Sequence, residues 1–323
     1  MHYTFVTDAG TTKLRITLLD ESGRVIGKVS SDDGVKHTAE DGDNHRLLAA
    51  LKKGYGQLIS DAGIRDTDTL SCIAYGMITS NTGLYEVPHL TLPASEKELR
   101  SGIRRVDFPD LLPCPVSFIP GLRTETGIDG FYPDMMRGEE TEIIGLHTLL
   151  KPDGDRLYVL PGSHNKLIHV TRDGFITSFK TTVSGELLEA MTKHSILADS
   201  VERSFLVSEE YDAAEMLKGA AAASDEGFTH AAFSVRTRRV LEHGTAVEAR
   251  NFLLGTVLAG DLAALRTFSP DKDRFRVVIA GRSVMVSALN DLFTSDGYRV
   301  SSVPEEVSAE MGLRGALRIF YGA

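Results

Sequence analysis

The strongest constraint on the fold is a pattern of short strands and tight turns that occurs twice in the chain. Residues 3–7, 14–19 and 24–29 are β-rich runs, separated by a Gly-Thr turn and then by an Asp-Glu-Ser-Gly turn. Residues 157–160, 166–170 and 175–179 repeat this order around Pro-Gly-Ser-His and Arg-Asp-Gly. Aspartate and glycine supply the backbone angles that hairpin turns require. Each half of the chain is therefore predicted to begin with a three-stranded antiparallel meander.

The spacing of the turn glycines indicates that the two meanders are copies of one unit. Gly10 and Gly23 are 13 residues apart, and Gly162 and Gly174 are 12 residues apart. A Lys-Leu pair follows the first turn in both halves. Any two β-meanders share strands and Asp-Gly turns, so the repeat favours a duplication without proving it.

Both meanders are followed by α/β alternation, which predicts two domains in a chain of 323 residues. A short apolar strand at 277–280, followed by glycine and a helical pattern, is typical of a parallel sheet. Helical spacing predicts helices over 139–150, 184–194, 201–207, 229–242, 245–267, 283–293 and 305–319. A Lys-Pro-Asp-Gly-Asp stretch at 151–155 ends the first of these helices. We place the boundary there, with an N-terminal domain of residues 1–152 and a C-terminal domain of residues 153–323.

Charge and cysteine content exclude several classes of protein. The 35 Lys and Arg against 45 Asp and Glu give a net charge of −10, which opposes binding to nucleic acid or to an anionic membrane. No apolar run reaches the ~18 residues of a membrane-spanning helix, and the N-terminus lacks the features of a signal peptide. The two cysteines, Cys72 and Cys114, form no CxxC pair. These features predict a cytoplasmic protein of a reducing compartment, with neither nucleic acid nor membrane as partner.

The first turn has the composition of a phosphate-binding loop. Gly10, Thr11 and Thr12 allow N–H groups and hydroxyls to approach phosphate oxygens, and Asp8 at the end of the strand can hold Mg²⁺ through its waters. Arg15 can reach a phosphoryl group or a substrate carboxylate. A plain hairpin turn is the alternative. Neither GxxxxGK[ST] nor a strand-to-helix GxGxxG occurs in the chain.

The second half offers a matching set of candidates. Gly162, Ser163 and His164 form the corresponding turn, and Lys166 heads the next strand as a candidate cation in a cleft. Gly281 follows the apolar strand at 277–280 and is a candidate for the nucleotide side of the site. A solvent-exposed turn histidine remains the alternative for His164, and no second His or Cys stands at zinc-ligand spacing from it.

These features together resemble the actin, Hsp70 and sugar-kinase superfamily. That resemblance implies an α/β protein with a duplicated, ribonuclease H-like fold of two domains and an ATP cleft between them. More specific segments resemble the 2-dehydro-3-deoxygalactonokinase family, in order, from residue 4 to about residue 300. They are MRGEETE at 136–142, LPGSHNK at 160–166, TVSGEL at 182–187 and GMITSNTG at 76–83, with further likeness at 233–236 and 251–255.

The resemblance implies a kinase that uses ATP and Mg²⁺ to phosphorylate the 6-hydroxyl of 2-dehydro-3-deoxygalactonate, a small acidic sugar. Ala9 and Leu167 stand where this family usually has tryptophan, which leaves the identity of the sugar open. A kinase of another aldonic or keto sugar is therefore an alternative, and an ATPase switch of the Hsp70 or actin kind is a more distant one. The sequence leaves a homodimer open.

A sugar kinase needs a carboxylate that orients and deprotonates the attacking hydroxyl. In related kinases this group lies at the start of a helix, and Glu139 is our candidate for the base, with Arg137 on the substrate or the γ-phosphate. Glu140, one position further along the same turn, is assigned to the substrate. Glutamate in a first helical turn is also favoured by the helix dipole alone. Asp129 and Asp134 remain rival bases.

The segment after the first domain's apolar strand completes the predicted site. Ser80, Asn81 and Gly83 would line the sugar pocket, with the hydroxyl and the amide as hydrogen-bonding groups. Without the family resemblance, Ser-Asn-x-Gly is a common turn composition.

Overall fold

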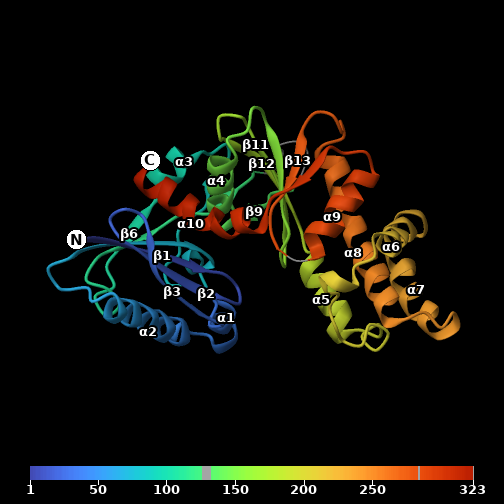
Figure 1. Ribbon diagram of the computed structural model, residues 1–323, viewed down its shortest axis with the longest axis horizontal. Coiled ribbons are helices and arrows are strands. Elements are labelled where there is room, and N and C mark those ends of the chain that lie inside the picture. Colours follow the sequence, from blue (N-terminus) through green and yellow to red (C-terminus); the bar gives the residue numbers. More distant parts are fainter. Residues whose placement is uncertain (126–131, 283, 323) are drawn as a thin grey trace. The chain divides into compact units, whose positions relative to one another are not determined.

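The computed structural model describes residues 1–125, 132–282 and 284–322, and it is a mixed α/β protein (Figure 1). Asp129, one of the rival bases, lies outside the described residues. By its internal contacts the chain divides into two units. The first comprises Met1–Lys151, Asp173–Thr177 and the chain from Glu310 onward, and the second comprises Pro152–Arg172 and Ser178–Ala309.

The first unit is built on a six-stranded sheet with the order β3-β2-β1-β4-β7-β6. β1 is antiparallel to β2 and parallel to β4, β2 is antiparallel to β3, and β4 is parallel to β7. The first predicted meander is therefore correct. The strands are β1 (His2–Ala9), β2 (Leu14–Leu19), β3 (Val25–Ser31), β4 (Thr69–Gly76), β6 (Arg104–Val106) and β7 (Val116–Phe118).

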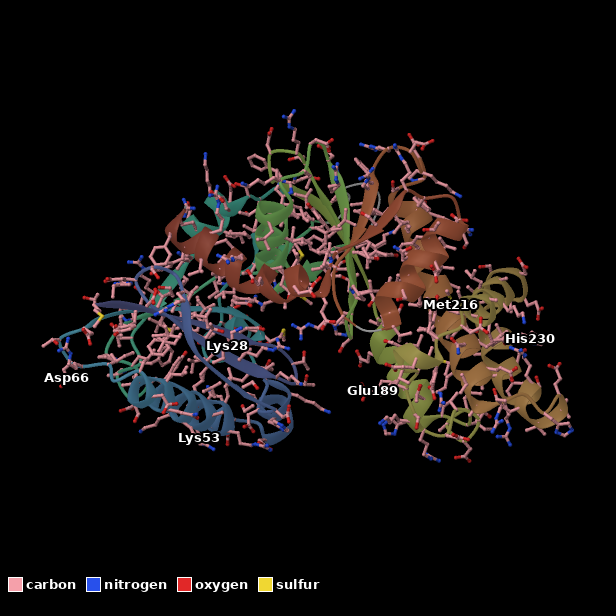
Figure 2. All side chains as sticks on the ribbon, viewed as in Figure 1. Lys28, Lys53, Asp66, Glu189, Met216 and His230 are labelled. Carbon is pink, nitrogen blue, oxygen red and sulfur yellow. The ribbon has the colours of Figure 1, made fainter. Side chains whose placement is uncertain are left out.

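Helix α2 (His45–Asp61) covers one face of this sheet (Figure 1). Its apolar positions recur at helical spacing, and Leu51 and Tyr55 pack into the same buried cluster as Phe5 of β1. Lys53, on the opposite side of α2, points away from the sheet (Figure 2). The other elements of this unit are α1 (Lys36–Asp41), α3 (Glu96–Gly102), α4 (Glu139–Leu150) and a small sheet of β5 (Leu90–Thr91), β8 (Leu122–Arg123) and β9 (Met135–Met136).

The second unit is built on a five-stranded sheet with the order β12-β11-β10-β13-β14. β10 is antiparallel to β11 and parallel to β13, which is parallel to β14. Both sheets thus place the first strand of a meander beside a parallel strand from later in the chain, which confirms the duplicated fold class. The strands are β10 (Arg156–Leu160), β11 (Asn165–Val170), β12 (Ile176–Thr182), β13 (Arg276–Ile279) and β14 (Val300–Ser302).

Helices account for most of the rest of the second unit. α8 (Ala246–Phe268) and α9 (Val284–Ser295) lie next to the sheet, with α6 (Ala213–Glu226) and α7 (Phe228–Leu241) further out and α5 (Ser184–His194) following β12 (Figure 1). α6 and α8 touch backbone to backbone, because a Cβ on Gly255 would lie 1.8 Å from the Met216 carbonyl oxygen. Met216 itself lies in the buried interior of this unit (Figure 2).

Two expectations differ from the structure. The helix expected over 201–207 does not form, because Glu202 and Arg203 have positive φ angles of 55° and 50°, which no helix tolerates. The last helix, α10 (Glu305–Tyr321), was expected to close the second domain, but from Glu310 onward it groups with the first unit. Glycines allow this packing, since a Cβ on Gly315 would lie 1.8 Å from the Thr141 carbonyl oxygen of α4.

The described helices include none that is long and apolar enough to cross a membrane.

Candidate active site

The end of β1 and the start of β2 hold an ion pair at the head of the first meander. Asp8 and Arg15 are directly opposite each other in the antiparallel register. The Arg15 Nη1 donates to Asp8 Oδ2 at 2.7 Å. Burial raises the pKa of the Asp8 carboxyl, while the Arg15 charge and hydrogen bond oppose that increase. The residues predicted at this position are therefore brought together.

In the turn between β1 and β2, the backbone carbonyls and the backbone N–H groups point to opposite sides. The carbonyls of residues 10–12 accept hydrogen bonds from the N–H groups of residues 34–36 at 2.8 to 3.3 Å. In a trans peptide the N–H of the next residue points opposite to the carbonyl. The N–H groups of residues 11–13 therefore point away from residues 34–36, on an exposed turn. Successive N–H groups directed to one side are suited to bind an anion.

Two glycines bring the start of α4 against the ends of β1 and β4. Gly76 and Gly138 have φ angles of 83° and 114°, and a Cβ on Gly138 would lie 3.2 Å from the Gly76 Cα. A Cβ on Gly76 would in turn lie 2.9 Å from the Ala9 carbonyl oxygen and 3.5 Å from Asp8 Oδ1. The first turn of α4 is thereby placed next to Asp8.

The glutamates of this turn have different environments. Glu139 is half-buried, and its Oε2 accepts from the Arg137 N–H at 3.0 Å. Glu140 is fully buried, and both of its oxygens accept from the Gly138 N–H, at 2.9 and 2.8 Å. Burial, and then the Glu139 charge, raise the pKa of Glu140 to about 8. The substrate role expected for Glu140 does not fit this placement, because the side chain supports the loop from inside.

Glu142 is a carboxyl of this site that the sequence analysis did not single out. Burial, and then the charge of Asp8, raise its pKa well above the ordinary range, and Arg15 opposes this increase. It follows Glu139 by three positions, and this i, i+3 spacing on one helix face is the signal that could have found it.

Arg137 was expected on the substrate or the γ-phosphate, but its guanidinium is turned into the unit. Nη1 donates to the carbonyl and hydroxyl oxygens of Thr79 at 2.5 and 2.6 Å, and Nη2 donates to the Val87 carbonyl at 2.9 Å. The His89 ring lies 3.1 Å from Nη2. The guanidinium thus ties the segment of residues 79–89 to the loop before α4.

That segment carries the three residues predicted for the sugar. Ser80 is buried, and its hydroxyl donates to the Met77 carbonyl at 2.7 Å. Gly83 is buried as well, and a Cβ there would lie 2.2 Å from the Ile78 carbonyl oxygen. Asn81 is exposed.

Asp134, the rival base, lies just before β9, and its Oδ1 accepts from the Met135 N–H at 2.7 Å.

In the second unit, the turn after β10 is closed by a side chain. The Gly162 N–H donates to Asn165 Oδ1 at 2.9 Å, and the Ser163 carbonyl accepts from the Glu186 N–H at the start of α5 at 2.9 Å. His164 is exposed, and its Nε2 lies 2.8 Å from Glu186 Oε2.

Lys166 differs from the expectation of a cation exposed in a cleft. Its side chain is 4% exposed, and its Nζ donates to Thr181 Oγ1 of β12 at 2.7 Å. Gly281, at a φ angle of 159°, approaches the other side of the turn, since a Cβ there would lie 3.1 Å from the Pro161 ring.

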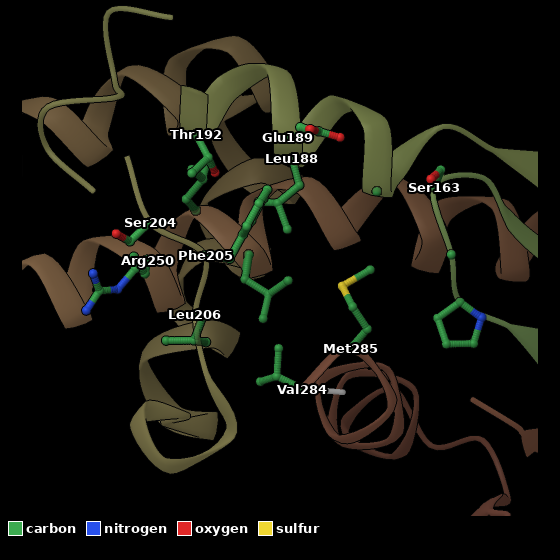
Figure 3. Close-up of a pocket in the computed structure, with 15 residues that line it drawn as sticks. Ser163, Leu188, Glu189, Thr192, Ser204, Phe205, Leu206, Arg250, Val284 and Met285 are labelled. Carbon is green, nitrogen blue, oxygen red and sulfur yellow. The ribbon is translucent and has the colours of Figure 1, made fainter. Parts of the chain in front are cut away.

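A cavity of about 320 Å³ lies beside this turn. Leu188, Phe205 and Met285 point toward one another from three different segments (Figure 3). Helical spacing does not indicate this wall, because Phe205 lies within the segment of residues 201–207 that was expected to be helical. The lining residues are Pro161, Gly162, Ser163, Gly185, Leu188, Glu189, Thr192, Ser204, Phe205, Leu206, Arg250, Leu253, Leu254, Val284 and Met285.

Comparison with known proteins shows the family of the chain. A family model described as 2-keto-3-deoxy-galactonokinase matches residues 8–316. The chain belongs to this family. The resemblance inferred from the motifs is thereby confirmed, and the chain is a carbohydrate kinase.

Relatives of this kinase family align with most of the chain. A probable 2-dehydro-3-deoxygalactonokinase of Rhizobium meliloti (strain 1021) is 27% identical, over 99% of this chain and 98% of the relative. The 2-dehydro-3-deoxygalactonokinase of Escherichia coli (strain K12) is 26% identical, over 74% of this chain and 75% of the relative. The crystal structure of a candidate 2-dehydro-3-deoxygalactonokinase from Sinorhizobium meliloti has the same fold, with a TM-score of 0.80, 24% identity and coverage of 99% and 100% of the two chains.

The residues of this kinase fit a magnesium ion that arrives with a phosphate ligand. In the described part of the chain, no group of three or more His, Cys, Asp or Glu is arranged to hold a metal. Magnesium in phosphoryl-transfer sites keeps several waters and uses one or two carboxylates together with substrate phosphates. Asp8 supplies one such carboxylate, and its charge is close enough to raise the pKa of the Glu142 carboxyl.

Proposed function

We propose that this carbohydrate kinase transfers the γ-phosphoryl group of ATP to the 6-hydroxyl of 2-dehydro-3-deoxygalactonate. Membership of the family supports the sugar acid as substrate. The observation that carries the phosphate chemistry is the turn of residues 10–13, in which the N–H groups of residues 11–13 are directed to one side next to Asp8. Such a turn can bind phosphate oxygens. The Asp8–Arg15 ion pair beside it suits ATP with Mg²⁺, because the carboxylate can bind the cation and the guanidinium can bind the phosphates.

The nucleotide base is assigned to the cavity of the second unit. Ligand pockets for heterocycles are mostly apolar, with a few polar groups at the edge. Leucines and Phe205 form the walls here, while Glu189 and Thr192 are polar lining residues. Gly162 and Ser163 line the same cavity, so a base bound there would have its phosphates near the second turn.

Asp8 would hold Mg²⁺ through its waters. When bound, the ion neutralises charge on the phosphate oxygens during transfer. Arg15 then has two tasks. Its Nη1 fixes the orientation of the Asp8 carboxylate, and its exposed guanidinium, 57% accessible, can donate to a phosphoryl oxygen or a substrate carboxylate.

Glu139 is proposed as the general base. Its Oε2 is oriented by the Arg137 N–H, and the side chain remains accessible in part. Glu140 is buried, and burial raises the pKa of Glu142, which disfavours the ionised carboxylate that a general base needs. Asp134 and Asp129 are the next candidates.

The test is a coupled assay of ADP release with ATP, Mg²⁺ and a panel of 2-keto-3-deoxy sugar acids, followed by ³¹P NMR of the product. We expect the highest kcat/KM with 2-dehydro-3-deoxygalactonate and a phosphorus signal coupled to the C6 protons. A different preferred sugar would replace this substrate with another aldonic or keto acid. ADP release that is independent of sugar would favour an ATPase switch instead.

A further inference from the structure

A carboxyl group is buried in the second unit at a place where the phosphoryl-transfer chemistry does not use it. Asp261 of α8 is 1% exposed. Its Oδ1 accepts from Asn165 Nδ2 at 3.0 Å and from Thr182 Oγ1 at 2.5 Å. Burying a carboxyl is costly unless it is paired or hydrogen-bonded, so these two contacts offset part of that cost.

The first contact leads to the second phosphate turn. Asn165 is fully buried, and its Oδ1 accepts the Gly162 N–H at 2.9 Å. A side-chain amide can rotate by 180° with little change of shape, which would exchange its donor and its acceptor. A carboxylate only accepts, so Asp261 selects the orientation in which the amide nitrogen faces α8 and the amide oxygen faces Gly162.

The second contact leads to the start of α5. Thr182 precedes this helix and accepts from the Ser184 hydroxyl at 3.2 Å. In the same first turn, a Cβ on Gly185 would lie 2.0 Å from the Gly162 carbonyl oxygen. One oxygen of Asp261 therefore joins the two segments that contact each other beside the cavity.

We propose that Asp261 is a positioning residue for nucleotide binding, which fixes the turn of residues 161–165 through Asn165 and the start of α5 through Thr182. It touches no ligand itself. The proposal rests on the assignment of ATP phosphates to this turn. It predicts that changes at Asp261 affect affinity for ATP and leave the KM for the sugar unchanged, because the sugar residues belong to the first unit.

Two substitutions at Asp261 distinguish the effect of its hydrogen bonds from the effect of its negative charge. In Asp261→Asn one amide oxygen can accept both hydrogen bonds, so ATP affinity should stay within about twofold of the wild type. Asp261→Leu has similar size and no acceptor, and we expect about tenfold weaker ATP binding. Thr256→Val is the matched control, since Thr256 is a fully buried hydroxyl of the same helix whose bond goes to the Phe252 carbonyl at 2.9 Å. It should lower stability without affecting ATP affinity.

ATP binding is measured by isothermal titration calorimetry without sugar, and the two KM values are measured in the coupled assay. The double variant Asn165→Leu/Asp261→Leu should lose less ATP affinity than the product of the two single losses, because Asp261 acts in part through Asn165. If Asp261→Leu does not fold, Thr182→Val, which removes one of the two bonds, should still weaken ATP binding by a few fold.

Each remaining outcome counts against a specific claim. Wild-type affinity in Asp261→Leu, or equal losses in Asp261→Asn and Asp261→Leu, would overturn the positioning role while ATP binding by the wild type still stands. A wild-type protein that does not bind ATP would overturn the proposed function, and the positioning role with it.

Discussion

Asp8 and Arg15 occupy opposite positions of two antiparallel strands, and their charged groups are 2.7 Å apart. The pair has a partly buried carboxylate and a more exposed guanidinium, with side-chain accessibilities of 22% and 57%. Opposite charges at directly paired positions of a sheet stabilise each other modestly. The arrangement suits ligand binding better than stability, because burial raises the pKa of Asp8 despite its partner.

Asp8→Asn should abolish turnover and leave the fold intact. The amide keeps the size of the side chain but loses the charge that would organise Mg²⁺. Because burial disfavours the charged form of Asp8, the neutral amide should not lower the melting temperature. Steady-state kinetics and calorimetry of the variant check both parts. Asp20→Asn, in the turn after β2 where Asp20 accepts from Ser22 and Arg24, is the control and should retain activity. Normal turnover in Asp8→Asn would refute the phosphate-turn assignment.

Glu139→Gln and Glu140→Gln should have very different effects on turnover. Glutamine at 139 cannot accept the hydroxyl proton, so kcat should fall by ~10²–10⁴-fold with little change in substrate affinity. Glutamine at 140 keeps an oxygen that can accept the Gly138 N–H, so its effect on kcat should be mild. If Glu140→Gln is the more damaging change, the roles of the two residues are exchanged. If neither matters, Asp134 and Asp129 are tested next.

Glu140 should also make the stability of the protein depend on pH. Its pKa is raised from an ordinary value near 4.5 to about 8, so the folded state holds this proton more tightly than the unfolded state. Its contribution is therefore favourable below pH 4.5 and is lost as the pH rises toward 8. The wild type should lose melting temperature relative to Glu140→Gln between about pH 5 and pH 8. If the melting temperatures of the two proteins changed equally with pH across this range, the result would contradict the burial of Glu140 as an ionisable group.

The overall fold could be predicted because its signals are local. Alternating apolar residues and Asp-Gly turns indicate a meander within some 25 residues, and the pattern occurs twice. The helix expected over 201–207 failed for a local reason as well. Glu202 and Arg203 adopt the left-handed conformation. Glycine or asparagine in a sequence normally indicates this conformation, whereas glutamate and arginine do not. Phe205 is consequently a cavity wall, which helical spacing does not indicate.

The roles of the site residues depend on contacts that the sequence does not state. Glu139 and Glu140 share one helical turn, and only the packing of α4 decides which of them is buried. Arg137 lies two and three positions before them, yet its guanidinium binds Thr79, which is 58 positions earlier. Asp261 and Asn165 are 96 residues apart and belong to no common motif. Pairing across such distances requires the tertiary structure.

Arg137→Ala should release the segment of residues 79–89, and His89 reports this release without any assay of activity. Burial, then the charge of Arg137, then that of Arg123, lower the pKa of His89 to about 4. Removing Arg137 should therefore raise the pKa of His89, as measured by NMR titration of its ring protons. Arg123→Ala is the control and should raise it by less, because the charge of Arg123 contributes less to the pKa shift.

In Arg137→Ala the oxygens of Thr79 and Val87 would also lose a charged donor, which lowers the free energy of unfolding by about 2–3 kcal/mol. Since Asn81 lies on the released segment, the KM for the sugar should rise and the KM for ATP should not. An unchanged His89 pKa would show that the guanidinium does not hold this position in solution, and Arg137 would again become a candidate for direct contact with the substrate.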